Sequence, residues 1–286
     1  MILVTGAGGK TGRAVIRALV RRRAEVRAFV RRPDQVGLLR PLGVREVVVG
    51  DLLSPHDVPW AMRGAAAVYH ICPNVSPDEV TIGRLAIRAA RRMGVARFVY
   101  HSVLQPHSRA LPHHRLKGRV ERLLLRAGVP SVILRPASYM QNVLAGWDRI
   151  VRERVYAVPY ALSTRLGLVD LDDIAEVAAM ALTEDGHLGR VYDLAAGEVL
   201  DQREIAAVLS RVLGRSVQPQ VIPRDVWEQR ARAAGLGDYQ VTTLRAMFRY
   251  YERRGFWGDP SVLTMLLGRP PTTFAAFVER VALGRI

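Results

Sequence analysis

The chain has 286 residues, carries a net charge of +16, and is 49% apolar. This length supports a sizeable core, and this apolar content excludes a disordered chain. No apolar run of 18 residues is present, so we expect no membrane span. The N-terminus lacks the parts of a signal peptide, and the cytoplasm is the expected compartment. One cysteine, Cys72, allows no intramolecular disulfide and no cysteine cluster, and we expect no metal site.

The positive charge raises nucleic acid as a partner. However, the arginines are spread over most of the expected helices, and only two of the 42 basic residues are lysines, Lys10 and Lys117. This preference for arginine indicates a compositional bias. We therefore expect a solvated basic surface that attracts phosphate-bearing ligands, and no nucleic-acid partner.

The first residues predict a strand, a glycine turn and a helix. Residues 2–4 form a short apolar run, and helical periodicity begins after Gly12. Glycine allows the backbone to approach a ligand closely, and the helix start offers unpaired N–H groups with a positive dipole end. This order predicts the pyrophosphate site of a dinucleotide. The alternative is a glycine turn in another α/β fold. The expected cofactor contacts are Gly6, Gly8, Gly9, Lys10, Thr11 and Gly12.

A second strand is expected over residues 25–31, and it ends in Arg31 and Arg32. In a dinucleotide fold this strand end meets the adenosine ribose, where an acidic residue selects NAD and an arginine accommodates the 2′-phosphate of NADP. Two arginines stand here, so NADP(H) is favoured and NAD(H) is the alternative. Asp34 follows Pro33 and fits the first turn of a helix. The two arginines can also be surface residues without such a role.

Strands and helices alternate along the next part of the chain. Further strands are expected over 45–49, 66–71, 97–102 and 132–136, with helices over 54–63, 77–93 and 112–127. This alternation predicts an α/β fold with a doubly wound parallel sheet and a ligand beyond the carboxyl ends of its strands. Asp51 can reach the adenine edge there or serve as a loop residue or helix cap. Cys72 is expected near the cofactor.

The later residues predict a smaller, mostly helical C-terminal lobe. We expect domains over residues 1–150 and 151–286, interleaved in space. Residues 137–142 are expected to enter a helix. The lobe is expected to contain strands over 166–169 and 191–194, and helices over 172–182, 201–213, 224–234, 239–253 and 271–283.

Three residues fit a proton-handling site. Ser102 ends a strand, and His113 and Lys117 lie four residues apart on one helix face. Together they can handle a proton beside a nicotinamide. The alternative is that the histidines are exposed residues at a helix start.

Several sequence motifs, taken together, resemble those of the NmrA-like family, which consists of atypical relatives of the short-chain dehydrogenases. The resemblance covers nearly the whole chain. It rests on the following segments: Thr5-Gly6-x-x-Gly9-x-x-Gly12, Arg31-Arg32-Pro33, Gly50-Asp51, Leu134-Arg135-Pro136 with Asn142, Val169-Asp170-x-Asp172-Asp173-Ile174-Ala175, and Leu267-Gly268-Arg269-Pro270-Pro271-Thr272-Thr273-Phe274.

The resemblance implies a Rossmann fold that binds NAD(P), usually NADP, on the glycine loop. Some members reduce quinones or similar acceptors, and others are redox-sensing regulators that bind proteins. The wider superfamily uses a serine, a tyrosine and a lysine. Ser102 and Lys117 match the serine and the lysine, but His113 replaces the tyrosine. A histidine donates a proton only when protonated, so the usual alcohol dehydrogenation is in doubt. Lys117 keeps its expected role on the nicotinamide ribose.

The expected function is therefore an NAD(P)H-dependent oxidoreductase that passes hydride to a quinone-like or other conjugated acceptor. Such a small molecule accepts hydride with little acid catalysis from the protein. The alternative is a non-catalytic NADP(H) sensor that acts through a partner protein. A further alternative is an epimerase or another reductase with Lys117 as base. The sequence gives no indication of the oligomeric state.

Overall fold

The structure of the protein is a computed structural model that describes residues 1–284. The chain forms two compact units. Unit 1 contains Met1–Ser108, His113–Pro136 and Leu171–Tyr192, and unit 2 contains Arg109–Pro112, Ala137–Asp170 and the residues from Asp193 onward. The division into domains at residue 150 stays a prediction.

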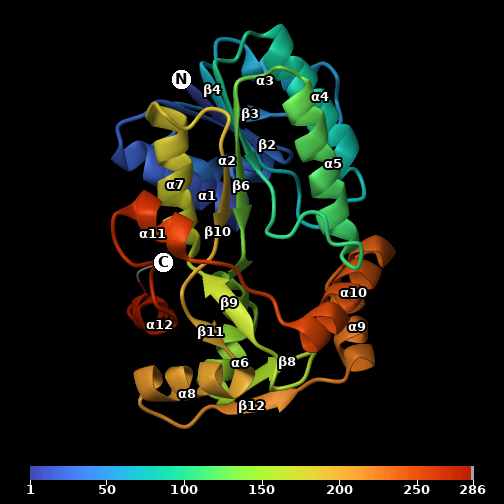
Figure 1. Ribbon diagram of the computed structural model, residues 1–286, viewed down its shortest axis with the longest axis vertical. Helices are drawn as coiled ribbons and strands as arrows, with labels where there is room; N and C mark the ends of the chain where they lie inside the picture. Colours follow the sequence, from blue (N-terminus) through green and yellow to red (C-terminus); the bar gives the residue numbers. More distant parts are fainter. Residues whose placement is uncertain (285–286) are drawn as a thin grey trace. The chain divides into compact units, whose positions relative to one another are not determined.

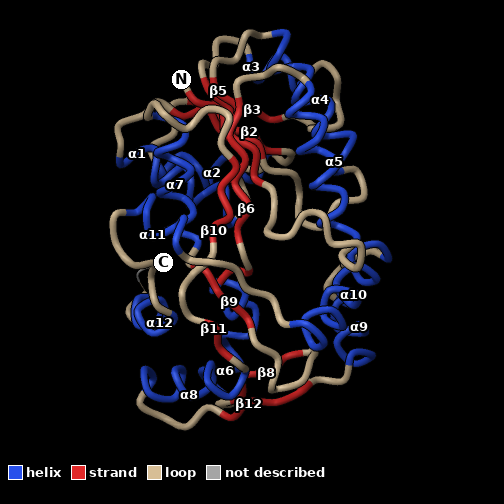
Figure 2. The backbone as a smooth tube through the Cα atoms, viewed as in Figure 1, coloured by secondary structure: helices blue, strands red, loops and turns tan. Residues whose placement is uncertain are grey.

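A seven-stranded sheet forms the centre of unit 1, and it appears as one band of strands in Figure 2. Its strands are β1 (Ile2–Val4), β2 (Val26–Val30), β3 (Glu46–Val49), β4 (Ala67–His70), β5 (Arg97–His101), β6 (Ser131–Pro136) and β10 (Val191–Leu194). The spatial order is β10-β6-β5-β4-β1-β2-β3, and strands β1 to β6 pair in parallel. The predicted doubly wound parallel sheet is confirmed. The strand order reverses between β1 and β4, where a sheet of this type opens a crevice for its ligand.

Helices cover both faces of this sheet (Figure 1). Helices α1 (Lys10–Arg21) and α7 (Leu171–Thr183) pack together, and α7 also contacts β4, β5 and β6. On the other face, α3 (Asp57–Met62), α4 (Glu79–Arg92) and α5 (Pro112–Arg126) share one apolar core with the sheet. The remaining short helices of this unit are η1 (Pro33–Gln35), α2 (Val36–Leu39) and η2 (Arg40–Leu42).

The structure corrects the expected place of two elements. The sequence assigned α7 and β10 to the C-terminal lobe, but β10 is the edge strand beside β6, and α7 lies in unit 1. The reason is the composition of α7. It is rich in alanine and buried on most sides, so it needs neighbours on both sides, which α1 and the sheet supply.

Unit 2 combines helices with two small sheets. The sheets contain β7 (Ser138–Tyr139), β9 (Leu166–Val169) and β11 (Val199–Leu200), and β8 (Val155–Val158) with β12 (Gln218–Val221). The helices are η3 (Met140–Gly146), α6 (Trp147–Arg152), α8 (Gln202–Leu213), α9 (Arg224–Ala233), α10 (Asp238–Arg254), α11 (Ser261–Leu267) and α12 (Phe274–Ala282).

The structure also corrects the expected helix entry at residues 137–142. The two residues Ser138 and Tyr139 form β7, which pairs with Leu168 and Val169 of β9 before the 3-10 helix η3 begins. Here the backbone pairs with a strand 30 residues further along the chain, and this pairing replaces the helix that the local pattern predicts. The sequence also missed β8, β11, β12 and α11, which are short and lack a strong periodic pattern.

Candidate functional site

The glycine turn adopts a backbone that side chains would disturb. Gly6 has a φ of +59°, in the left-handed region, and a Cβ there would lie 2.8 Å from Ile71 Cγ2. A Cβ on Gly12 would lie 2.4 Å from the carbonyl oxygen of Gly6 and 2.7 Å from Ala7 Cα. Glycine at position 12 therefore lets the start of α1 pack tightly on the turn after β1, and glycine at position 6 lets that turn approach Ile71.

The start of α1 is open to an anion. Gly9 is the N-cap, no side chain caps the helix, and its first turn holds no acidic residue. The first-turn N–H groups and the positive dipole end therefore face outward without a side-chain acceptor. Lys10 and Arg13 add positive charge to this turn. The residues fit the pyrophosphate of a dinucleotide, as the sequence predicts, with Gly8 and Thr11 in the same turn.

Arg31 and Arg32 lie exposed at the carboxyl end of β2. Arg32 Nε donates to Asp34 Oδ1 at 3.2 Å, and both side chains are well exposed. Pro33 begins η1, so the expected helical turn at Asp34 is present. Gln35 of the same turn packs against Gly8. The turn that follows the two arginines therefore lies beside the glycine turn, and the expected contact of Arg31 and Arg32 with a phosphate stays a prediction.

Asp51 follows β3 and is exposed. Its Oδ1 accepts a hydrogen bond from Leu53 N at 2.9 Å, and its own N–H donates to Asp57 Oδ2 at 2.9 Å. The hydrogen bond from Asp51 lowers the pKa of Asp57. Asp51 thus shapes its own loop, which fits the loop alternative. Its contact with adenine stays a prediction.

Lys117 is mostly buried and has two hydrogen-bond acceptors. Its Nζ lies 3.1 Å from Glu79 Oε1 and 3.1 Å from the carbonyl oxygen of His101, and 14% of its side chain is exposed. The ammonium also lies 5.5 Å from the centre of the Tyr100 ring. Tyr100 donates its hydroxyl to the same Glu79 oxygen at 2.8 Å.

Cys72 follows β4 and is buried beside this group. Burial, followed by the nearby charge of Glu79, raises the pKa of its thiol, so the thiol stays protonated. Its expected cofactor contact stays a prediction.

Ser102 has a different acidic partner from Lys117. The serine is buried, and its hydroxyl donates to Glu121. Arg135 donates to both oxygens of Glu121, at 3.0 and 2.6 Å. The hydroxyl of Ser102 is therefore part of a buried hydrogen-bonded group, and its expected catalytic role stays a prediction.

His113 lies beside Lys117 in α5, as the spacing predicts. Burial, then the positive neighbours His114 and Lys117, lower the pKa of His113 to about 3. Its ring packs edge-on against His114 with the centroids 4.3 Å apart. The exposed-histidine alternative is therefore wrong for His113. At neutral pH its imidazole is uncharged and has no acidic proton to give.

Neither Tyr100 nor Tyr69 replaces the missing tyrosine. Tyr100 is fully buried, and burial together with Glu79 raises its pKa well above the usual value. Its proton is committed to Glu79. Tyr69 is equally buried and is hydrogen bonded to His101 Nδ1 at 2.5 Å.

Sequence reasoning missed Glu79 and Glu121, the two acids that hold the predicted polar residues. The signal available was their position. Glu79 opens the helix that follows β4, and Glu121 lies four residues after Lys117. Buried acids at the carboxyl edge of a parallel sheet are candidates for partners of site residues.

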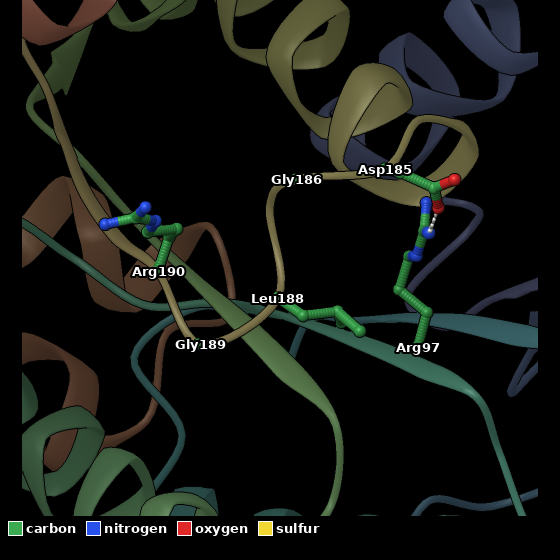
Figure 3. Close-up of a pocket in the computed structure, with 6 residues that line it drawn as sticks. All are labelled: Arg97, Asp185, Gly186, Leu188, Gly189 and Arg190. Carbon is green, nitrogen blue, oxygen red and sulfur yellow. Dashed lines mark hydrogen bonds and ion pairs between the residues drawn. The ribbon is translucent and has the colours of Figure 1, made fainter.

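A separate pocket of about 540 Å³ lies near the amino-terminal end of β5, away from the carboxyl ends of the strands (Figure 3). Arg97 there donates to Asp185 at 2.9 Å and to the carbonyl oxygen of Glu184. Arg190 points away from that pair. The charge of Arg97 is already matched, and the pocket is remote from the glycine turn, so it is not part of the candidate site.

Two features are absent from residues 1–284. No cluster of three or more histidine, cysteine, aspartate or glutamate residues that could hold a metal ion occurs among them. None of their helices is long and apolar enough to cross a membrane.

This fold and glycine turn define a dinucleotide-binding protein of the Rossmann class. A model of the NmrA-like family matches residues 1–277, so the chain belongs to the NmrA-like family. The resemblance seen in the sequence is confirmed.

Relatives match the chain over nearly its full length. An NAD(P)H azoreductase of Xenophilus azovorans is 28% identical and covers 98% of this chain and 97% of its own. A (4-alkanoyl-5-oxo-2,5-dihydrofuran-3-yl)methyl phosphate reductase of Streptomyces griseus is 32% identical, covering 96% and 95%. The crystal structure of the Escherichia coli NADPH-dependent quinone oxidoreductase QOR2 with NADPH is 26% identical, covers 99% and 100%, and has a TM-score of 0.84.

Proposed function

We propose that this protein is an NADPH-dependent oxidoreductase that passes hydride to a quinone-like or other conjugated small molecule. The comparisons support the oxidoreductase class and the use of NAD(P)H, as the sequence predicts. The choice of acceptor rests mainly on the protonation state of His113. This histidine stands where the superfamily has its proton-donating tyrosine, and its lowered pKa leaves it uncharged at neutral pH.

The names of the relatives support this choice. They act on an azo compound, an unsaturated furanone and a quinone. Each of these acceptors has a double bond conjugated to electron-withdrawing or aromatic groups. Such a group accepts hydride and delocalises the resulting charge, so the enzyme needs little acid catalysis.

The chain's own residues supply binding and orientation. In this proposal the α1 start and the glycine turn hold the pyrophosphate, and Arg31 and Arg32 hold the 2′-phosphate of NADPH. In the same proposal Lys117 binds the nicotinamide ribose. When bound, the cofactor supplies the hydride, and the protein contributes proximity and alignment. A cytoplasmic location and the absence of a nucleic-acid partner are part of this proposal.

The test is NADPH oxidation by the purified protein with quinones, azo dyes, unsaturated lactones and saturated ketones. We expect turnover well above the rate without enzyme for the conjugated acceptors, and none for saturated ketones. Tight NADPH binding without turnover on any acceptor would contradict the proposal and indicate a sensor. Turnover of saturated ketones alone would indicate acid catalysis that His113 does not provide at neutral pH.

A further inference from the structure

Lys117 occupies a position where the composition of the chain would favour arginine. The sequence has 42 basic residues, and only Lys10 and Lys117 are lysines. An ammonium is a compact charge with three N–H donors, whereas a guanidinium is a broad planar fork. The requirement at residue 117 is therefore for a small charged group in a confined space.

Glu79 is the acidic side chain that restricts the space around the Lys117 ammonium. The carboxylate is buried, and its Oε1 accepts from Lys117 Nζ at 3.1 Å and from the Tyr100 hydroxyl at 2.8 Å. Glu79 is the first residue of α4, where the positive dipole end favours a carboxylate. The residue is thus held by its own helix start and by a phenol that keeps its proton. This makes Glu79 a fixed support and not a mobile counter-ion.

Two of the three N–H donors of Lys117 are used, by Glu79 and by the His101 carbonyl oxygen. The third has no hydrogen-bond partner among the described residues, and part of the side chain stays exposed. A tetrahedral ammonium with two donors fixed has its third donor fixed in direction as well.

We propose that Glu79 is a positioning residue that locks Lys117 and aims its remaining N–H at a hydroxyl group of the bound cofactor. This inference rests on the proposed use of NADPH. Glu79 itself does not touch the cofactor. Its carboxylate keeps the ammonium oriented, and Tyr100 keeps the carboxylate in place.

The test uses the fact that the chain has two lysines. Acylation of each amine by a small activated ester, followed by mass spectrometry, reports Lys117 with Lys10 as the internal reference. The ion pair with Glu79 holds the Lys117 nitrogen in place, and its loss frees the amine to react with the ester. We expect Glu79→Gln to raise the rate at Lys117 at least tenfold relative to Lys10, and to weaken NADPH binding at least fivefold. At saturating NADPH, kcat should change less than the KM for NADPH.

Two variants complete the design. Glu25→Gln removes a surface acid that pairs with Arg45 and should change neither measurement. Tyr100→Phe removes one donor to Glu79 while it keeps the ring, and should give a smaller change in the same direction. If Glu79→Gln does not fold, the same two measurements on Tyr100→Phe decide the proposal.

Unchanged Lys117 reactivity or unchanged NADPH affinity in the folded variants would overturn the proposal. Failure of the proposed function would look different, since the unmodified protein would then bind NADPH without turnover. Lys117 reactivity and NADPH affinity would still decide the role of Glu79 in that case.

Discussion

A Cβ atom on Gly12 would lie 2.4 Å from the carbonyl oxygen of Gly6, whereas one on Gly9 would lie 3.3 Å from the same oxygen. The two glycines of one motif therefore have different physical roles. Gly12 is required for the packing of α1 against the turn. Gly9 is exposed and has an extended backbone, so a side chain there requires only a small shift of the Gly6 oxygen.

This difference gives a matched pair of variants. Gly12→Ala should lower the free energy of unfolding by about 1–3 kcal/mol, because the methyl group meets backbone atoms that cannot move aside. Gly9→Val should leave the unfolding midpoint nearly unchanged but abolish NADPH binding, because its side chain stands where a phosphate must approach. Thermal unfolding and calorimetric titration measure the two effects. If Gly9→Val binds NADPH with full affinity, the glycine turn is not part of the cofactor site.

Arg31 and Arg32 are expected to select NADPH over NADH. The double change to alanine should weaken NADPH binding by roughly tenfold or more, since a charge-assisted hydrogen bond is worth about 1.5–3 kcal/mol, and should leave NADH nearly unchanged. Asp34→Asn frees Arg32 from an exposed ion pair and should strengthen NADPH binding slightly. Dissociation constants for both cofactors check this. Equal losses for both would show that the arginines only add to the general positive field.

Variants of Lys117 and His113 should distinguish a role in cofactor binding from a role in proton transfer. Lys117→Ala should weaken NADPH binding and lower turnover. His113→Ala should keep turnover within a few-fold, whereas loss of a general acid costs about 10²–10⁴-fold. Because the pKa of His113 is about 3, its charge does not change between pH 5 and 9, and it should produce no step in the rate profile there. A hundredfold loss in His113→Ala with intact NADPH binding would contradict the mechanism.

Acid should destabilise the protein through the buried residues His70, His101 and His114 and the half-buried His113. Burial, followed by the charge of Lys117, lowers the pKa of His70 and His101 to about 3. Burial likewise lowers the pKa of His113 to about 3 and that of His114 to about 4. The unfolded chain binds these protons near pH 6.5, so it holds more protons than the folded state below that pH.

Stability is therefore fully present above about pH 6.5 and falls as the pH decreases, with a slope of up to about 1.4 kcal/mol per pH unit for each histidine. Urea unfolding between pH 7.5 and 4.5 measures the slope. His70→Phe removes one titrating group and should make the slope shallower, while the exposed His56→Gln should not. An unchanged slope in His70→Phe would show that His70 already titrates in the folded state.

Local chemistry determined much of unit 1 from the sequence. Residues 2–4, the glycines and the apolar face of residues 10–21 specify strand, turn and helix through contacts within about 20 residues of chain. The same local patterns placed Arg31, Asp51 and Ser102 at strand ends, and the parallel sheet then brings those ends to one edge. Spacing alone placed His113 and Lys117 on one helix.

Tertiary structure decided what those side chains contact. Lys117 meets Glu79 across 38 residues, and Ser102 meets Glu121 across 19. A side chain finds such partners only after helices α4 and α5 pack on the sheet, so no local pattern contains them. The partial burial of His113 likewise follows from packing, and it contradicts the alternative of an exposed histidine. The places of α7 and β10 depend on the same cause, because an edge strand and a buried helix are defined by their neighbours.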